Sequence, residues 1–74
     1  MYITYKKLWH LLLDKGMSRQ DLRLKTGLST ASLAKLSKGE NITTDVLLRI
    51  CEALDCNITD IMETVRDEDE IGND

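Results

Sequence analysis

The sequence predicts an all-α protein, a compact bundle of five short helices. Two observations carry this prediction. Apolar residues recur at helical spacing along the chain, and no segment shows the period-two alternation of a half-buried strand. The chain has 74 residues, and because it contains no Phe and only 4% aromatic residues, its core must consist mainly of Leu and Ile.

The first helix is expected to run from a cap at Thr4 to about Lys15. One buried stripe follows helical spacing along it and consists of Tyr5, Leu8, Trp9, Leu12 and Leu13. We expect Trp9 to be a core residue, because aromatic side chains dominate small cores. Gly16 then ends the helix.

Residues 17–39 predict two further helices joined by a tight corner. Ser18 and Ser29 are suitable N-caps, and Asp21 stands three residues after Ser18, where its carboxylate completes a capping box. Gly27 is placed to end the first of these helices in a left-handed conformation, which reverses the chain. We interpret the stretch as a helix-turn-helix, held together by Leu22, Leu28, Leu33 and Leu36.

Two more helices complete the predicted bundle. The fourth covers about 44–54, with an apolar face of Val46, Leu47, Ile50, Cys51 and Leu54. A short fifth helix, capped by Thr59 or Asn57, carries Ile58, Ile61, Met62 and Val65. Residues 1–65 therefore form one domain, and residues 66–74, which are nearly all acidic after Arg66, predict a disordered tail.

The residue types argue against catalysis, metal binding and membrane insertion. Cys51 and Cys56 are five residues apart, which would separate them by about 140° on a helix, and His10 has no ligand partner in the sequence. We expect no metal and no cofactor, and both cysteines to be small buried side chains. No catalytic triad, carboxylate pair or phosphate-binding Gly-rich loop is present. The longest apolar run spans residues 11–13, so we expect a cytoplasmic protein without a membrane partner.

The charge is divided along the chain. Residues 1–39 hold eight Lys and Arg against two Asp and Glu, a net charge of +6, whereas residues 40–74 hold two against eleven, a net charge of −9. The overall charge of −3 therefore hides a basic half that suits a phosphate-bearing partner.

A helix-turn-helix sets its second helix in the major groove of DNA, with the N-terminal residues toward the bases. With Ser29 as the cap, that face carries the predicted base-reading residues Thr30, Ala31, Ser32 and Lys35. Phosphate contacts are expected at the rim, from Arg19, Gln20, Ser29, Lys38, Asn41, Thr43 and Thr44. The predicted partner is double-stranded DNA, and no small-molecule ligand is evident.

The stretches LRLKTGLS, TASLAKLSKG and VLLRICEALDCNITDIM resemble the Cro/C1-type helix-turn-helix domain of the XRE family, which is lambda-repressor-like, over roughly residues 4–65. The resemblance implies a five-helix, sequence-specific transcriptional regulator, commonly a repressor that binds a palindromic operator as a homodimer. It places Arg19 where many members have a phosphate-binding Gln. Two positions depart from the family pattern: Arg23 replaces a small Ala, and Leu24 replaces a polar residue.

Dimerisation is expected because one recognition helix reads only a few base pairs. The predicted interface is the fifth helix, with Ile58, Ile61, Met62 and Val65, and pairing of Tyr2 and Ile3 across a two-fold axis is the second candidate. An alternative function is an antitoxin-like or regulatory protein-interaction module that uses the fifth helix and the acidic tail. Co-purification of a basic partner would favour that alternative.

Overall fold

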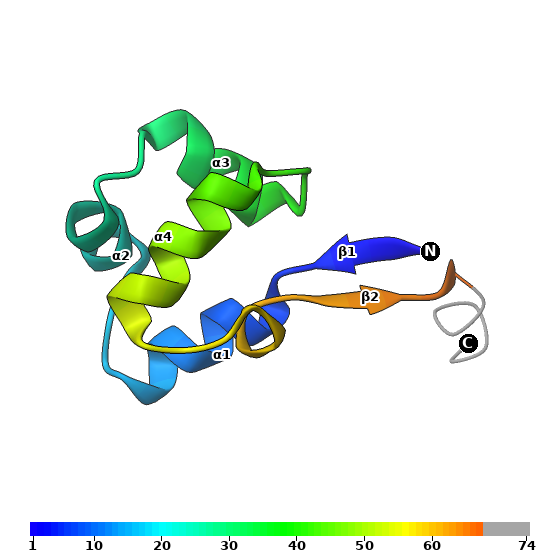
Figure 1. Cartoon of the computed structure of the whole chain (residues 1–74), viewed down its shortest axis with the longest axis horizontal. Helices are drawn as coiled ribbons and strands as arrows, with labels where there is room; N and C mark the ends of the chain where they lie inside the picture. The colour runs from blue at the N-terminus through cyan, green and yellow to red at the C-terminus, as the bar shows by residue number, and fades with distance from the viewer. Residues whose placement is uncertain (68–74) are drawn as a thin grey trace.

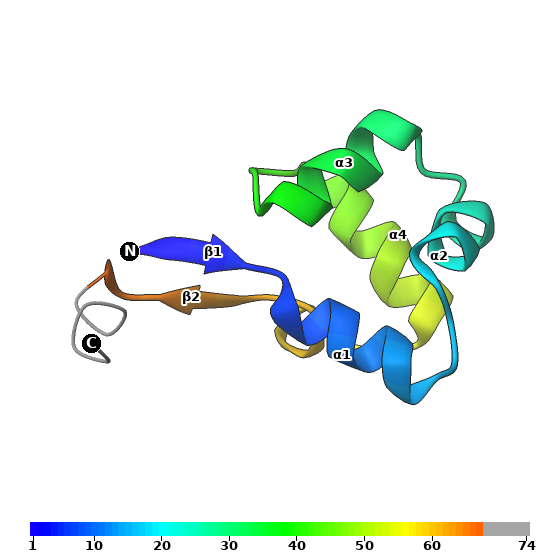
Figure 2. The same ribbon diagram turned by 180° about the vertical axis from the view of Figure 1, so that it is seen from behind.

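The computed structural model describes residues 1–67, which form four α-helices and a two-stranded antiparallel sheet (Figure 1 and Figure 2). The helical body consists of α1 (Lys6–Asp14), α2 (Arg19–Thr26), α3 (Thr30–Lys38) and α4 (Thr44–Leu54). The strands β1 (Tyr2–Thr4) and β2 (Glu63–Val65) extend from this body side by side, and a 3-10 turn, η1 (Ile58–Asp60), precedes β2.

One apolar core lies between the helices. Its completely enclosed side chains are aliphatic, as expected from a chain without Phe, and they are Leu8, Leu22, Leu36, Ile50 and Ile61. Helix α4 crosses the middle of the molecule and packs against α2, while α1 closes the core on the opposite side from α3 (Figure 2). This packing fixes α2 and α3 on a rigid support, which a binding surface requires.

The buried stripe of α1 is narrower than predicted. The helix is capped by Tyr5, not Thr4, and it buries Leu8 and Leu12. Leu13 is 76% exposed, so its assignment to the core is wrong. Leu13 lies about 100° around the helix from Leu12, and the small core of this chain does not extend that far.

The predicted fifth helix is wrong. Between α4 and β2 the chain forms the single turn η1, in which the Asp60 carboxylate accepts from the backbone N–H of Asn57 at 2.9 Å and the backbone N–H of Asp60 donates to the carbonyl of Asn57 at 2.9 Å. The chain then continues as β2, which pairs with β1 in the register Tyr2↔Val65, Ile3↔Thr64 and Thr4↔Glu63. The fold is therefore mostly helical with a small sheet. Three residues per strand are too few to show an alternating pattern, and each strand has its partner at the other end of the chain.

The end of α4 brings the two cysteines together. Asp55 adopts a left-handed conformation with φ 51°, and the backbone N–H of Cys56 donates to the carbonyl of Cys51 at 3.0 Å. This turn also places the thiol of Cys56 next to the thiol of Cys51. Burial, together with the neighbouring Cys51, raises the pKa of Cys56 to about 11. The predicted 140° separation assumed a continuous helix, but the helix stops at Leu54. Both thiols are free and half-buried.

The predicted acidic tail lies largely outside the described residues, which end at Asp67. Asp67 itself accepts a hydrogen bond from the N-terminal ammonium group of Met1 at 3.0 Å. Within residues 1–67, no helix has the length and apolar character that crossing a membrane requires. The same residues contain no group of three His, Cys, Asp or Glu side chains that could hold a metal ion.

Candidate nucleic-acid interface

The start of α2 is fixed by the predicted capping box. The hydroxyl of Ser18 accepts a hydrogen bond from the backbone N–H of Asp21 at 3.1 Å, and the Asp21 carboxylate accepts one from the backbone N–H of Ser18 at 2.9 Å. The hydrogen bond that the carboxylate accepts from the backbone of Ser18 is the main cause that lowers the pKa of Asp21, and the Ser18 side chain contributes to the same shift. An ionised carboxylate also suits the positive end of the helix dipole.

The corner between α2 and α3 has the predicted geometry. Gly27 adopts the left-handed conformation with φ 73°, which a side chain would make costly, and Leu28 beyond it is buried. Ser29 then caps α3, with its hydroxyl accepting from the backbone N–H of Ser32 at 3.1 Å. Leu22 and Leu36 pack into the core on either side of the corner, whereas Leu33 is only half-buried. The corner therefore sets α3 at the edge of the body (Figure 1).

The predicted base-reading side chains lie on one helix but differ in exposure and in hydrogen bonding. Thr30, Ala31 and Lys35 are exposed on α3. Ser32 is half-buried, and its hydroxyl oxygen accepts a hydrogen bond from the hydroxyl of Ser29 at 3.1 Å. The hydroxyl of Ser32 therefore keeps its proton and one lone pair for a further hydrogen bond.

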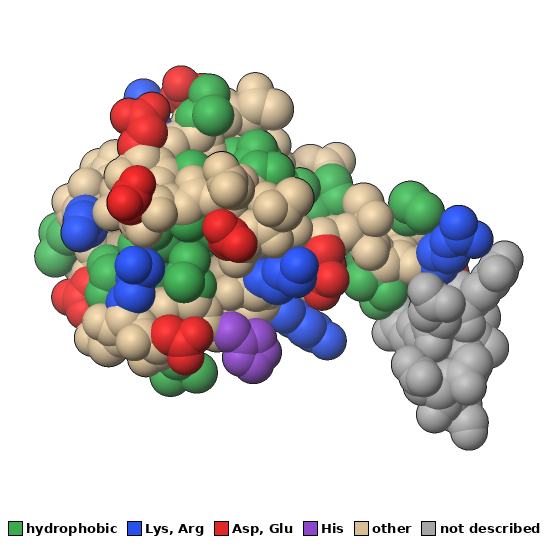
Figure 3. Space-filling model, turned by 60° about the horizontal axis from the view of Figure 1, so that its bottom comes forward, with side chains coloured by type: hydrophobic (Ala, Val, Ile, Leu, Met, Phe, Trp, Pro, Cys, Tyr) green, Lys and Arg blue, Asp and Glu red, His purple; other side chains and the backbone are tan. Residues whose placement is uncertain are grey.

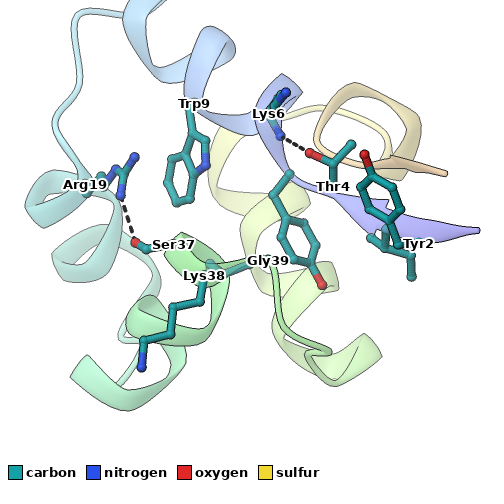
Figure 4. Close-up of a pocket in the computed structure, with 11 residues that line it drawn as sticks. Tyr2, Thr4, Lys6, Trp9, Arg19, Ser37, Lys38 and Gly39 are labelled. Carbon is teal, nitrogen blue, oxygen red and sulfur yellow. Dashed lines mark hydrogen bonds between the residues drawn. The ribbon is translucent and has the colours of Figure 1, made fainter. Parts of the chain in front are cut away.

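A first group of predicted phosphate-binding residues lies at the start of α2. The guanidinium carbon of Arg19 lies 4.0 Å from the centroid of the Trp9 ring, and one of its nitrogens donates to the hydroxyl of Ser37 at 2.9 Å (Figure 4). The side-chain oxygen of Gln20 accepts a hydrogen bond from Arg23 at 3.3 Å. Both Arg19 and Gln20 are exposed.

A second group follows α3. Lys38 and Asn41 are exposed, and Thr43 caps α4 by accepting a hydrogen bond from the backbone N–H of Val46 at 3.4 Å. Thr44 is the first residue of that helix, where backbone N–H groups lack helical partners and suit an anion. The turn before them is anchored by the hydroxyl of Tyr5, which donates to the carbonyl of Glu40 at 3.0 Å.

The two departures from the family pattern are accommodated without rotating α2. Leu22 is fully buried, while Leu24 is 66% exposed and contributes nothing to the core. Arg23 is half-buried, and its head group turns along the helix to Gln20. At the position where the family usually has a small residue, the apolar part of the Arg23 side chain is thus half-buried while its charged end stays at the surface.

Charge is arranged differently on two faces of the molecule. A groove of about 430 Å³ between β1, the start of α1, the start of α2 and the end of α3 is lined by Lys6, Arg19 and Lys38, and no acidic residue among residues 1–67 lines it. The face on the side of α1, shown in Figure 3, instead mixes Lys and Arg with Asp and Glu side chains. Repulsion of a phosphate by carboxylates is therefore weaker in this groove than on the face of α1.

The structure adds two residues that the sequence did not assign to this surface. Trp9, predicted as a core residue, is half-buried and presents its ring to Arg19. Ser37 is exposed and binds the same guanidinium. The packing of α2 against both α1 and α3 brings these residues together through Arg19, and the only sequence signal for it is the short turn between α1 and α2.

The predicted dimer-forming residues do not share one surface. Ile61 is fully buried in the core of the single chain, which leaves it no area for a partner. Ile58 is exposed, while Met62 and Val65 are half-buried and Val65 pairs with Tyr2 within the chain. Residues 58–65, which the alternative interaction function would use together with the tail, form η1 and β2 in place of a helix.

Comparisons with known proteins agree with this geometry. The model of the Cro/C1-type HTH DNA-binding domain matches residues 7–67. The crystal structure of the transcriptional regulator VanUg, Form II, superposes with a TM-score of 0.86 and is 44% identical, covering 89% of this chain and 88% of that one. No curated protein matches the sequence.

Proposed function

The chain belongs to the Cro/C1-type helix-turn-helix DNA-binding family, and on this premise we propose that it is a cytoplasmic repressor that binds a palindromic operator as a homodimer. The observation that carries the proposal is the first turn of α3. Thr30 and Ala31 are exposed there, directly after a corner whose angle is fixed by Gly27 and Leu28. A helix held in this way can enter the major groove with its N-terminus first.

The chemistry of α3 suits readout at short range. The hydroxyls of Thr30 and Ser32 donate to or accept from base edges, and the methyl group of Ala31 packs against a thymine methyl. Lys35, one turn further along, reaches guanine O6 and N7 or a phosphate. Because three of these four side chains are short, α3 must lie deep in the groove.

Phosphate contacts on both sides of α3 would set its register. Arg19 and Gln20 stand at the start of α2, while Lys38, Asn41 and the first N–H groups of α4 follow α3. Ser29 contributes at the corner between them. Contacts of this kind position a protein on the duplex but do not choose the sequence.

The proposed homodimer would double the length of sequence that is read. Of the predicted interface, Ile58, Met62 and Val65 retain exposed area, and they lie in and after η1. Two half-sites about one helical turn apart then impose a palindromic operator. Light scattering with and without DNA measures the stoichiometry, and Ile58→Asp is expected to weaken the dimer.

The proposal is tested by selecting the duplexes that the chain binds from a random pool and then measuring its affinity for the selected duplex. Thr30→Ala and Ser32→Ala are expected to change the preferred bases, with losses of about 1–3 kcal/mol per good contact. Thr59→Ala, an exposed threonine on η1 away from α3, is the matched control and should bind as the wild type. Equal binding to all duplexes, with no effect of the α3 variants, would refute sequence-specific recognition. A selected site without two-fold symmetry would refute the palindromic homodimer.

A further inference from the structure

The guanidinium group of Arg19 is held by two elements besides its own helix. The ring of Trp9, on α1, lies under it at 4.0 Å, and Ser37, on α3, accepts one of its hydrogen bonds at 2.9 Å. Figure 4 shows Arg19 beside Trp9, with a dashed line that marks its hydrogen bond to Ser37. Arginine side chains on a surface normally sample many rotamers, so this arrangement restricts a group that elsewhere would be mobile.

The contacts leave the charge of Arg19 available. A ring face attracts a cation through its quadrupole without neutralising it, and Ser37 is uncharged. One of the five guanidinium donors is used by Ser37. Among residues 1–67, the salt bridges pair other groups, and no carboxylate lines the groove beside Arg19. The group is therefore fixed in position and still able to bind an anion through two parallel hydrogen bonds.

The support for Arg19 is itself rigid. Trp9 is half-buried and packs against the core cluster, so its ring cannot swing away without opening the interface with the body. Lys6 and Lys38 line the same groove and add positive charge around Arg19. A single site therefore combines a planar donor, a fixed ring and two further cations.

We propose that Trp9 is a positioning residue that holds Arg19, together with Ser37, for one phosphate of the bound DNA strand. The proposal rests on the DNA-binding function above and adds the residue that orders its phosphate contact. Trp9 does not touch the DNA in this arrangement. It raises affinity because the arginine does not have to be ordered when the duplex binds.

A double-mutant cycle in the full chain tests the coupling. Trp9→Leu is expected to weaken binding to the selected duplex about tenfold, and Trp9→Phe, which keeps a ring, less than threefold. In an Arg19→Ala background, Trp9→Leu should have no further effect on affinity. Equal losses in both backgrounds would mean that Trp9 acts only through general stability and would overturn the proposal. Lys15→Ala, an exposed cation away from the groove, controls for charge.

A second measurement avoids dependence on the folding of the Trp9 variants. Neutral methylphosphonates are placed one at a time along the duplex, and the affinity of wild-type, Arg19→Ala and Arg19→Lys chains is measured. At one position the methylphosphonate is expected to lower the affinity of the wild type about tenfold and to leave the affinity of the Arg19→Ala chain unchanged. On the unmodified duplex, the Arg19→Lys chain should bind more tightly than the Arg19→Ala chain but less tightly than the wild type. If no position behaves in this way, Arg19 binds no single phosphate and the proposal fails, even where sequence-specific binding itself is intact.

The intrinsic fluorescence of the wild-type chain adds a direct readout, because Trp9 is the single tryptophan. Binding of the selected duplex is expected to shift its emission, because a phosphate then approaches the guanidinium that lies on the ring, and to reduce quenching by iodide. The methylphosphonate at the Arg19 position should abolish that shift under saturating conditions. An unchanged shift would overturn the proposed link between Trp9 and the phosphate.

Discussion

The α2–α3 corner and the β1–β2 sheet are both small, but different interactions hold them. The corner is built from contacts within three residues, such as the hydrogen bond from the backbone N–H of Ser32 to the hydroxyl of Ser29, and from the left-handed Gly27. The sheet joins Tyr2 to Val65, near opposite ends of the described chain. The comparison indicates that the α2–α3 corner is specified by neighbouring residues, whereas the sheet joins segments that are remote in the sequence. Changes to one region should therefore leave the other intact.

The largest expected effect is in the core beneath the corner. Leu22→Ala removes a completely buried side chain and should lower the free energy of unfolding by about 2–5 kcal/mol. Leu24→Ala, two residues along the same helix but 66% exposed, should change it by less than about 0.5 kcal/mol. Urea unfolding of both variants measures the difference, and similar losses would show that α2 is rotated from the orientation described.

The backbone of the corner should give the next largest effect. Gly27→Ala forces a side chain into the left-handed conformation and should cost about 1–2 kcal/mol. Asp55→Gly, at the left-handed residue after α4, should act in the opposite direction and stabilise the chain by up to about 1 kcal/mol. Thermal unfolding compares the two substitutions, and a neutral Gly27→Ala would contradict the importance of this corner.

The difference between the regions also explains what the sequence could predict. Caps at Ser18 and Ser29 and the turn at Gly27 are encoded by neighbouring residues, so α2, α3 and their exposed face were predictable. The strand at 63–65 was not, because its partner is remote and the apolar spacing of Ile58, Ile61 and Val65 also fits a helix. The contact of Arg19 with Trp9 depends on how α1 meets α2, which no local pattern encodes.

The sheet should tolerate change without loss of the α2–α3 corner. Val65→Gly removes the cross-strand pair with Tyr2 and should destabilise the chain by about 1 kcal/mol or less. Hydrogen exchange should increase in β1 and β2 and stay unchanged in α2 and α3. Faster exchange throughout α3 would show that the two regions are coupled.

The smallest expected effect concerns the capping carboxylate. Folding lowers the pKa of Asp21, so its ionised form stabilises the folded state above the ordinary carboxyl range, and this contribution is lost as the pH falls through the lowered pKa. Asp21→Asn should therefore flatten the acid limb of the melting temperature against pH. Asp14→Asn, an exposed carboxylate at the end of α1, is the control for net charge. Parallel curves for Asp21→Asn and the wild type would contradict the capping role.

The antiparallel register of β1 and β2 also determines how the molecule responds to mechanical force. Tyr2 and Val65 form the outermost pair, and Thr4 and Glu63 form the pair nearest the body. Tension that pulls Tyr2 and Val65 apart therefore loads one pair at a time, and the strands unzip before the load reaches the helices. The sheet therefore yields first under tension, and the helical body that carries α3 is expected to stay folded until Thr4 and Glu63 have separated.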